Sequence, residues 1–131
     1  MLTLDLKNGQ TFRTMSKRVI EIGEIYWVEY EMPPSEVVGH EQGKRRPGIV
    51  VQIESWANLA IVVPLTTQPP SKLTRSTAFI PQGVGNLPQD SYALCYQIRS
   101  VSHQRLQKKI GKIDGPTLDE LKEALLDFLD L

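Results

Sequence analysis

Gly48-Ile49-Val50-Val51-Gln52-Ile53 and Leu59-Ala60-Ile61-Val62-Val63-Pro64-Leu65 are the two apolar runs that decide the fold of this chain. Both are rich in β-branched side chains, and Gln52 is their only polar residue, a composition typical of strands buried on both faces. Residues 55–58 between them are short enough to form a turn. We therefore predict two neighbouring strands at the centre of a β-sheet.

Shorter segments on both sides of these runs predict further strands. In residues 24–30, Ile25 and Trp27 alternate with Tyr26, Val28 and Tyr30, which is the period-two pattern of a strand. We assign Trp27 to the core. Stretches rich in proline, glycine and charge predict the loops. The predicted strands are 24–30, 76–81, 91–101 and 109–113, the predicted loops are 31–47, 67–75 and 82–90, and residues 102–107 are predicted to form one helical turn capped by Ser102.

The N-terminal segment carries a hairpin signal of its own. Alternating leucines precede Asn8-Gly9, a pair that suits the two central positions of a tight turn. We expect residues 1–21 to form an extension with a β-hairpin, and residues 22–131 to form the main domain.

The C-terminal segment predicts an amphipathic helix. Leu118, Leu121 and Leu125 recur at helical spacing, and Thr117 with Glu120 has the spacing of a capping box. Several short strands followed by one such helix predict a mainly β (α+β) fold, in which a small barrel carries the helix on one side.

The charge of the chain is unevenly distributed, although its net charge is zero. Residues 39–113 hold ten lysines and arginines against three acidic residues, whereas residues 114–131 hold six acidic residues against one lysine. A basic middle is what a phosphate-binding surface requires, but the same charges can also be spread over a solvated surface. Charge alone therefore does not decide between these interpretations.

The sequence has none of the features of a secreted or membrane protein. No stretch approaches the roughly 20 apolar residues of a membrane helix, and the N-terminus lacks a basic region followed by an apolar one. The single cysteine, Cys95, lies in an apolar run and has no partner for an internal disulfide, so we expect it to be buried and reduced. These features predict a cytoplasmic protein.

Three polar segments beside the predicted strands are candidates for a binding or catalytic site. Residues 39–47 place three adjacent cations ahead of Pro47, where they can face one anionic ligand. Residues 64–68 end a buried strand in two threonine hydroxyls and an amide, and residues 97–101 carry Arg99 on their polar side. Each segment also has an ordinary interpretation, namely solvated charge, turn chemistry or a surface ion pair.

Together with Gly23 to Val28, these segments resemble the MazF/PemK family of toxin endoribonucleases in order and spacing. The matching stretches are Gly23–Val28, Gly39–Val51, Val63–Gln68 and Gln97–Val101. The resemblance implies a small Src-homology-3-like barrel of the PemK/CcdB type that acts as a homodimer. It also implies sequence-selective cleavage of single-stranded RNA, with mRNA as the target, and inhibition by a cognate antitoxin protein.

The resemblance also implies roles for individual residues. Arg46, which precedes Pro47, and Thr66 match the positions of the family's catalytic arginine and threonine, and Glu41 matches the acidic residue of the same loop. His40 stands where the family usually has serine, and the loop ahead of it is long. The expected RNA contacts are His40, Gln42, Lys44, Arg45, Thr67, Gln68, Lys72, Arg75, Gln97 and Arg99.

RNA supplies its own nucleophile, the 2′-hydroxyl, so this cleavage needs no metal or other cofactor. Arg46 and Thr66 would stabilise the charge that develops on the phosphate oxygens. Glu41 and His40 remain alternative general bases, and a pairing of His40 with His103 is a less favoured third. The expected products carry a 2′,3′-cyclic phosphate and a 5′-hydroxyl.

Two further questions stay open in the sequence. Trp56 is either a stacking platform for a base or, more commonly, a partly buried aromatic at the barrel edge. The alternative function is that of a CcdB-like toxin, which binds and poisons DNA gyrase without nuclease activity, and a peptide-binding adaptor is a third. A gyrase poison would not need both the arginine–proline pair at Arg46 and the segment Pro64 to Gln68, and the basic middle with few exposed aromatic residues argues against the adaptor.

Overall fold

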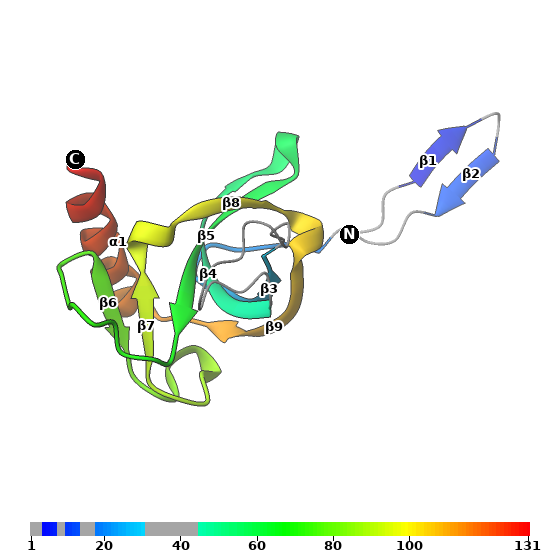
Figure 1. The fold of residues 1–131 in the computed structure, drawn as a ribbon. Coiled ribbons are helices and arrows are strands. Elements are labelled where there is room, and N and C mark those ends of the chain that lie inside the picture. The colour runs from blue at the N-terminus through cyan, green and yellow to red at the C-terminus, as the bar shows by residue number, and fades with distance from the viewer. Residues whose placement is uncertain (1–3, 8–9, 14–17, 31–44) are drawn as a thin grey trace, which may run out of the picture.

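The computed structural model describes residues 4–7, 10–13, 18–30 and 45–131 of the chain (Figure 1). These residues form nine strands, four short 3₁₀ turns and one α-helix. The strands are β1 (Leu4–Lys7), β2 (Gln10–Arg13), β3 (Glu24–Glu29), β4 (Arg45–Glu54), β5 (Leu59–Thr66), β6 (Thr77–Ile80), β7 (Ser91–Leu94), β8 (Arg99–Ser102) and β9 (Leu106–Lys112), the turns are η2 (Ser55–Ala57), η3 (Val84–Asn86), η4 (Cys95–Gln97) and η5 (His103–Arg105), and the helix is α1 (Gly115–Leu129).

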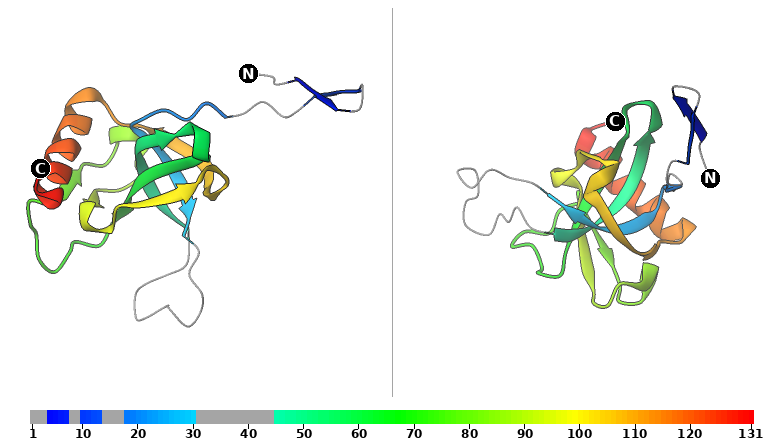
Figure 2. Two further views of the ribbon diagram at one scale, coloured as in Figure 1. Left: turned by 90° about the horizontal axis from the view of Figure 1, so that it is seen from above. Right: turned by 90° about the vertical axis from the view of Figure 1, so that its right-hand side faces the viewer.

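The β4–β5 hairpin is the centre of the main sheet, as predicted from the two apolar runs. The strands pair in the order β6-β7-β5-β4-β3-β9, and β8 pairs with β5 beside this path. The sheet curls into a barrel, but its two end strands, β6 and β9, do not pair with each other in this topology. Helix α1 packs on one side of the barrel (Figures 1 and 2). Strands β1 and β2 pair only with each other in this topology, as a separate two-stranded sheet. The fold class is therefore mainly β with one C-terminal helix, as expected.

The segment 91–101 is not the single long strand that the sequence predicts. It divides into β7 and β8 around the 3₁₀ turn η4. The reason is that β5 has to pair with both parts: Leu65 and Thr66 pair with β7, whereas residues 59–62 pair with β8. The chain turns a corner at the buried Cys95 to pass from one end of β5 to the other.

Two strand boundaries and one cap also differ from the sequence prediction. Strand β4 begins at Arg45 instead of after Pro47, because the fixed φ of proline is compatible with an extended strand, and Pro47 pairs with Trp27. Strand β9 begins at Leu106. The cap of α1 is Asp114, whose carboxylate accepts a hydrogen bond from the Thr117 N–H at 2.8 Å, so Thr117 is not the cap residue itself. The predicted helical turn after Ser102 is confirmed as η5, with the Ser102 hydroxyl as its cap.

Two buried clusters stabilise the domain. One lies inside the barrel and includes Tyr26, Val28, Val50 and Val62. The other lies between the sheet and α1 and includes Ile49, Leu65, Cys95 and Leu121. Successive residues of β4 and β5 belong in turn to one cluster and to the other. Both faces of the central hairpin are therefore buried, as its composition predicts.

Three single residues refine the sequence prediction. Burial raises the pKa of the Cys95 thiol to about 11, which agrees with the expected inert cysteine. Trp27 is only half-buried and was wrongly assigned to the core. Ile20, which the sequence places in the extension, is buried inside the barrel, because residues 18–21 run against it and Arg18 donates hydrogen bonds to the carbonyls of His103 and Gln107.

In the described part of the chain, no helix has both the length and the apolar character required to cross a membrane.

Candidate active site

The pairing register of β3, β4 and β5 determines where Arg46 lies. Arg46 pairs with Val28 of β3 on one side. On the other side the pairing of β4 with β5 ends at Gly48 and Pro64, which lie opposite each other and so have their side chains on the same face. Arg46 and Thr66 each lie two residues beyond this pair on their own strand. The two residues expected to act together are therefore at the same end of the β4–β5 hairpin and on the same face.

Arg46 and Thr66 lie on the face that forms the inside of the barrel. Because side chains alternate along a strand, Arg46 shares its face with Val50, and Thr66 shares its face with Val62. Both valines are fully buried in the cluster inside the barrel. Arg46 and Thr66 are half-buried at the end of this face, where the apolar interior meets solvent.

The Thr66 hydroxyl takes part in ordinary turn chemistry and keeps a hydrogen to donate. Its Oγ1 accepts a hydrogen bond from the Gln68 N–H at 3.1 Å. A hydroxyl has one donor hydrogen in addition to its acceptor lone pairs. The structural and the catalytic interpretations of Thr66 are therefore compatible, because one uses the lone pair and the other uses the hydrogen.

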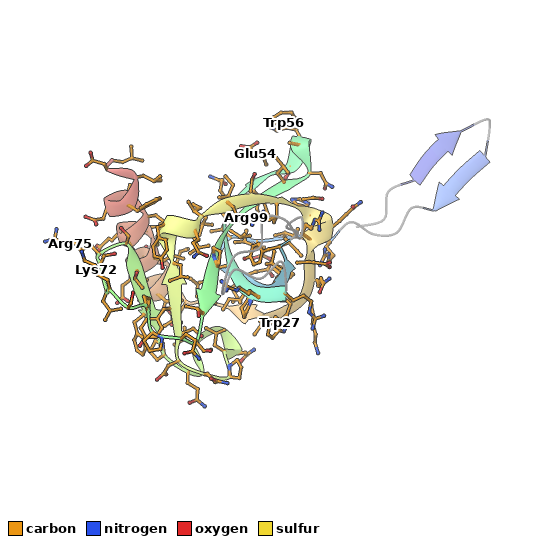
Figure 3. The ribbon with its side chains drawn as sticks, in the orientation of Figure 1. Trp27, Glu54, Trp56, Lys72, Arg75 and Arg99 are labelled. Carbon is orange, nitrogen blue, oxygen red and sulfur yellow. The ribbon has the colours of Figure 1, made fainter. Side chains whose placement is uncertain are left out.

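Two further side chains, Arg99 and Tyr30, reach the same end of the barrel. Arg99 of β8 pairs with Val62 of β5, so it shares the inner face, and its side chain is exposed (Figure 3). Its guanidinium lies over the ring of Tyr30, 5.1 Å from the ring centroid. Within the described residues, Arg99 forms no ion pair with a carboxylate. We name the group of Tyr30, Arg46, Gly48, Thr66 and Arg99 the barrel mouth.

Tyr30 was not among the residues predicted from the sequence. The alternation of residues 24–30 placed it on the same face as Tyr26 and Val28, which is correct, but gave it no role. The signal that could have found it is Gly48, since a glycine inside a buried β-branched run indicates that another group approaches closely.

Arg45 lies on the opposite face of β4 from Arg46, because side chains alternate along a strand. Its guanidinium lies over the ring of Trp27 at 5.7 Å, and its Nη1 donates to Oε1 of Gln107 at 3.2 Å. Gln107 in turn donates to Glu29 at 2.7 Å. The expectation that adjacent cations of this segment face one anion therefore does not hold for Arg45 and Arg46.

The other described candidates lie around the end of β5 or beside α1. Thr67 and Gln68 are exposed directly after β5, and Gln97 is exposed in η4. Lys72 and Arg75 lie in the connection from β5 to β6, away from Arg99 (Figure 3). Arg75 lines a cavity of about 460 Å³ together with the acidic residues Glu120, Glu123 and Asp127 of α1. Lys72 and Arg75 are thus not part of the barrel mouth.

Trp56 and His103 lie at the other end of the β4–β5 hairpin. Trp56, in the turn between the two strands, is 87% exposed, so the interpretation as a partly buried edge aromatic is wrong (Figure 3). The His103 Nε2 lies 3.1 Å from the carbonyl oxygen of Leu59, the first residue of β5. Thr66 is the last residue of that strand, roughly 23 Å away at the usual rise of a strand. His103 is therefore not positioned to act with Arg46 and Thr66.

Four residues expected at the site, His40, Glu41, Gln42 and Lys44, lie outside the described residues. Their roles, including the choice between His40 and Glu41 as general base, stay predictions from the sequence.

Comparison with known proteins agrees with the resemblance seen in the sequence. Residues 21–129 match the family described as the PemK-like, MazF-like toxin of type II toxin–antitoxin systems. Endoribonuclease EndoA of Bacillus subtilis is 33% identical over 111 residues, which cover 82% of this chain and 91% of that protein.

Solved structures share the fold. MazF of Deinococcus radiodurans has a TM-score of 0.67 and 22% identity, and the match covers 88% of this chain and all of that one. A MazE–MazF structure from the same organism has a TM-score of 0.64 and 18% identity, over 88% of this chain and 99% of that chain. These findings do not favour the gyrase-poisoning alternative.

Proposed function

Because the chain belongs to the PemK-like and MazF-like toxins of type II toxin–antitoxin systems, we propose that it is the toxin of such a system and acts as an endoribonuclease on single-stranded RNA. The observation that supports this proposal for the site is the strand register, which puts Arg46 and Thr66 on the same face, each two residues beyond the pair of Gly48 and Pro64. A guanidinium and a hydroxyl on adjacent strands can bind the same phosphate group.

The reaction that suits these residues is attack of the RNA 2′-hydroxyl on the adjacent phosphorus. A bond forms between the 2′-oxygen and phosphorus while the bond from phosphorus to the 5′-oxygen breaks. The proton of the 2′-hydroxyl passes to a general base, for which Glu41 and His40 are our candidates, and the 5′-oxygen receives a proton as it leaves. The products are a 2′,3′-cyclic phosphate and a 5′-hydroxyl.

Arg46 and Thr66 stabilise the transition state of this reaction. Negative charge accumulates on the two non-bridging phosphate oxygens as the new bond forms. The planar guanidinium of Arg46 can donate two parallel hydrogen bonds to them, and the Thr66 hydroxyl can donate a third. Their location at the edge of a buried, apolar interior strengthens these interactions relative to water.

We propose that the toxin is a cytoplasmic homodimer whose RNA-binding surface is also the target of a cognate antitoxin. A MazE–MazF structure among the matches supports an antitoxin partner for this chain. An acidic, flexible antitoxin segment would compete with RNA for the cations of the mouth. The remaining predicted RNA contacts are His40, Gln42, Lys44, Arg45, Thr67, Gln68, Lys72, Arg75 and Gln97.

The test is RNA cleavage in the presence of a chelator, measured as a single-turnover rate on a long, weakly structured RNA transcript. Arg46→Ala is expected to lower the rate about 100- to 1,000-fold, the usual cost of losing a donor to a developing oxyanion. Arg45→Ala removes the same charge one residue away, on the opposite face, and is expected to cause a much smaller loss, confined to RNA binding. Equal rates for Arg46→Ala and the wild type would contradict the proposed site.

A further inference from the structure

Tyr30 places an unusual hydroxyl at the barrel mouth. The residue directly follows β3 and is 4% exposed, inside the barrel. Its hydroxyl oxygen is fully buried and has no hydrogen-bond partner among the described residues. Buried polar groups without a partner are rare because each lowers the stability of the folded protein, so each requires an explanation.

Gly48 provides the space for this hydroxyl. A Cβ atom at position 48 would lie only 2.6 Å from the Tyr30 hydroxyl oxygen and 3.1 Å from Cγ2 of Val28. Contacts of 2.6 Å essentially do not occur for real Cβ atoms, so a side chain at position 48 would displace the Tyr30 hydroxyl. The hydroxyl therefore lies against the β4 backbone, two residues from Arg46 and on the same face.

The charges around Tyr30 favour a bound anion. The exposed guanidinium of Arg99 lies over the ring, and both Arg99 and Arg46 act electrostatically on the hydroxyl. Burial nevertheless raises the pKa of Tyr30 far above its ordinary value and outweighs the lowering by the two cations. The hydroxyl is therefore protonated and can donate a hydrogen bond.

We propose that Tyr30 is a further phosphate-binding residue of the active site, whose hydroxyl donates a hydrogen bond to a phosphate oxygen held by Arg46 and Arg99. The Arg99 guanidinium lies over the Tyr30 ring, 5.1 Å from its centroid. A phosphate bound by Arg99 and Arg46 supplies the hydrogen-bond acceptor that the buried hydroxyl lacks among the described residues. This inference rests on the proposed ribonuclease function.

The experiment compares Tyr30→Phe with Tyr26→Phe, because each change removes one hydroxyl and keeps the ring. The Tyr26 hydroxyl donates to Glu24 at 2.9 Å, so it has a structural partner, unlike that of Tyr30. Both variants are measured for single-turnover cleavage of the same RNA transcript and for the midpoint of urea unfolding.

Opposite results are expected for the two variants. Tyr30→Phe should lower the cleavage rate about 10- to 100-fold, the value of a hydrogen bond to a charged group, and should leave the urea midpoint unchanged or raised. Tyr26→Phe should lower the urea midpoint and leave the cleavage rate of the folded protein unchanged.

Three outcomes would overturn the inference. If Tyr30→Phe cleaves at the wild-type rate while Arg46→Ala does not, the role of Tyr30 is contradicted and the proposed ribonuclease function is not. If the rate loss of Tyr30→Phe is explained by a smaller folded fraction, the hydroxyl is structural. If the wild-type chain does not cleave RNA under conditions in which it is folded, the proposed function falls, and the inference falls with it.

Discussion

Tyr26 and Tyr30 lie on the same face of the barrel interior, four residues apart, yet their hydroxyls have different environments. The Tyr26 hydroxyl donates to the buried Glu24, and burial together with this hydrogen bond raises its pKa to about 12. The Tyr30 hydroxyl has no such partner in the described part of the protein. An arginine lies over each ring, Arg18 over Tyr26 and Arg99 over Tyr30. The two ends of one interior are thus built from similar residues.

Among the described residues, ion pairs with carboxylates distinguish the Tyr26 end from the surroundings of Arg99. At the Tyr26 end, Lys109 pairs with Glu24 at 2.5 Å and Lys112 pairs with Glu21 at 2.6 Å. At the mouth, Arg99 makes no ion pair within the described residues and lies over an aromatic ring instead. A cation that already has a carboxylate partner stabilises the fold, whereas a cation beside donors and rings can accept an external anion. We therefore expect the two ends to have different functions, a structural one at Tyr26 and the proposed RNA-binding one at Tyr30.

Among the tests of this difference between the two ends, the largest effect is expected on the cleavage rate when Thr66 at the barrel mouth is changed. Thr66→Val removes the hydroxyl but keeps the shape of the side chain, and should lower the single-turnover cleavage rate about 100- to 1,000-fold. Thr66→Ser keeps the hydroxyl and should retain most of the rate. Both variants should unfold close to the wild-type urea concentration. A fully active Thr66→Val protein would remove this hydroxyl from the mechanism.

A smaller effect, on stability instead of cleavage, is expected from Lys109 at the Tyr26 end. Lys109→Met leaves the Glu24 carboxylate, which is 3% exposed, without its cationic partner, and should lower the free energy of unfolding by about 1–3 kcal/mol. Lys112→Met breaks an exposed pair and serves as the control, with a much smaller expected loss because solvent screens this pair. Urea unfolding at neutral pH measures both. Equal losses for the two variants would contradict a structural role specific to the Glu24 site.

The smallest expected effect is a pH dependence of stability that originates at the same end. Burial alone would raise the pKa of Glu24, but hydrogen bonds from Lys109, the Glu21 N–H and Tyr26 outweigh it and lower the pKa below 4.5. A carboxylate with a lowered pKa contributes stability that is present above its unfolded value and is lost as the pH falls through its folded value. The free energy of unfolding should therefore decrease as the pH falls below 4.5.

Glu24→Gln is the control for this pH dependence. It should be less stable than the wild type at neutral pH and should lose less stability on acidification, since the titrating group is gone. Parallel stability curves for the two proteins between neutral and acidic pH would show that other carboxylates cause the dependence.

Local patterns were sufficient to predict most of the fold. The β-branched runs of the β4–β5 hairpin and the leucine spacing of α1 are signals that each segment carries by itself, and the structure confirms both. The break at residues 95–97 was missed because it depends on which strands β5 pairs with, and pairing is a property of the whole sheet. Trp27 was misassigned for a similar reason, since alternation defines two faces but not how completely each is covered.

The site was predicted in part for the same reason. The roles of Arg46 and Thr66 followed from a family resemblance in short motifs, which singled out Arg46 as the arginine before Pro47. The motifs could not show that Arg45 faces the other way. The positive charge of the middle segment also overstated its RNA-binding surface, because Lys109 and Lys112 already pair with glutamates.

The amino-acid sequence by itself determined the strands, the helix and the chemical groups available for catalysis, because these depend on residue type and on short-range periodicity. Only the tertiary structure decided which of those groups meet. Strand register put Arg46 and Thr66 at the same end of the β4–β5 hairpin and on the same face, and the missing side chain at Gly48 made room for the Tyr30 hydroxyl. Contacts of this kind join residues far apart in the chain, so no local pattern encodes them.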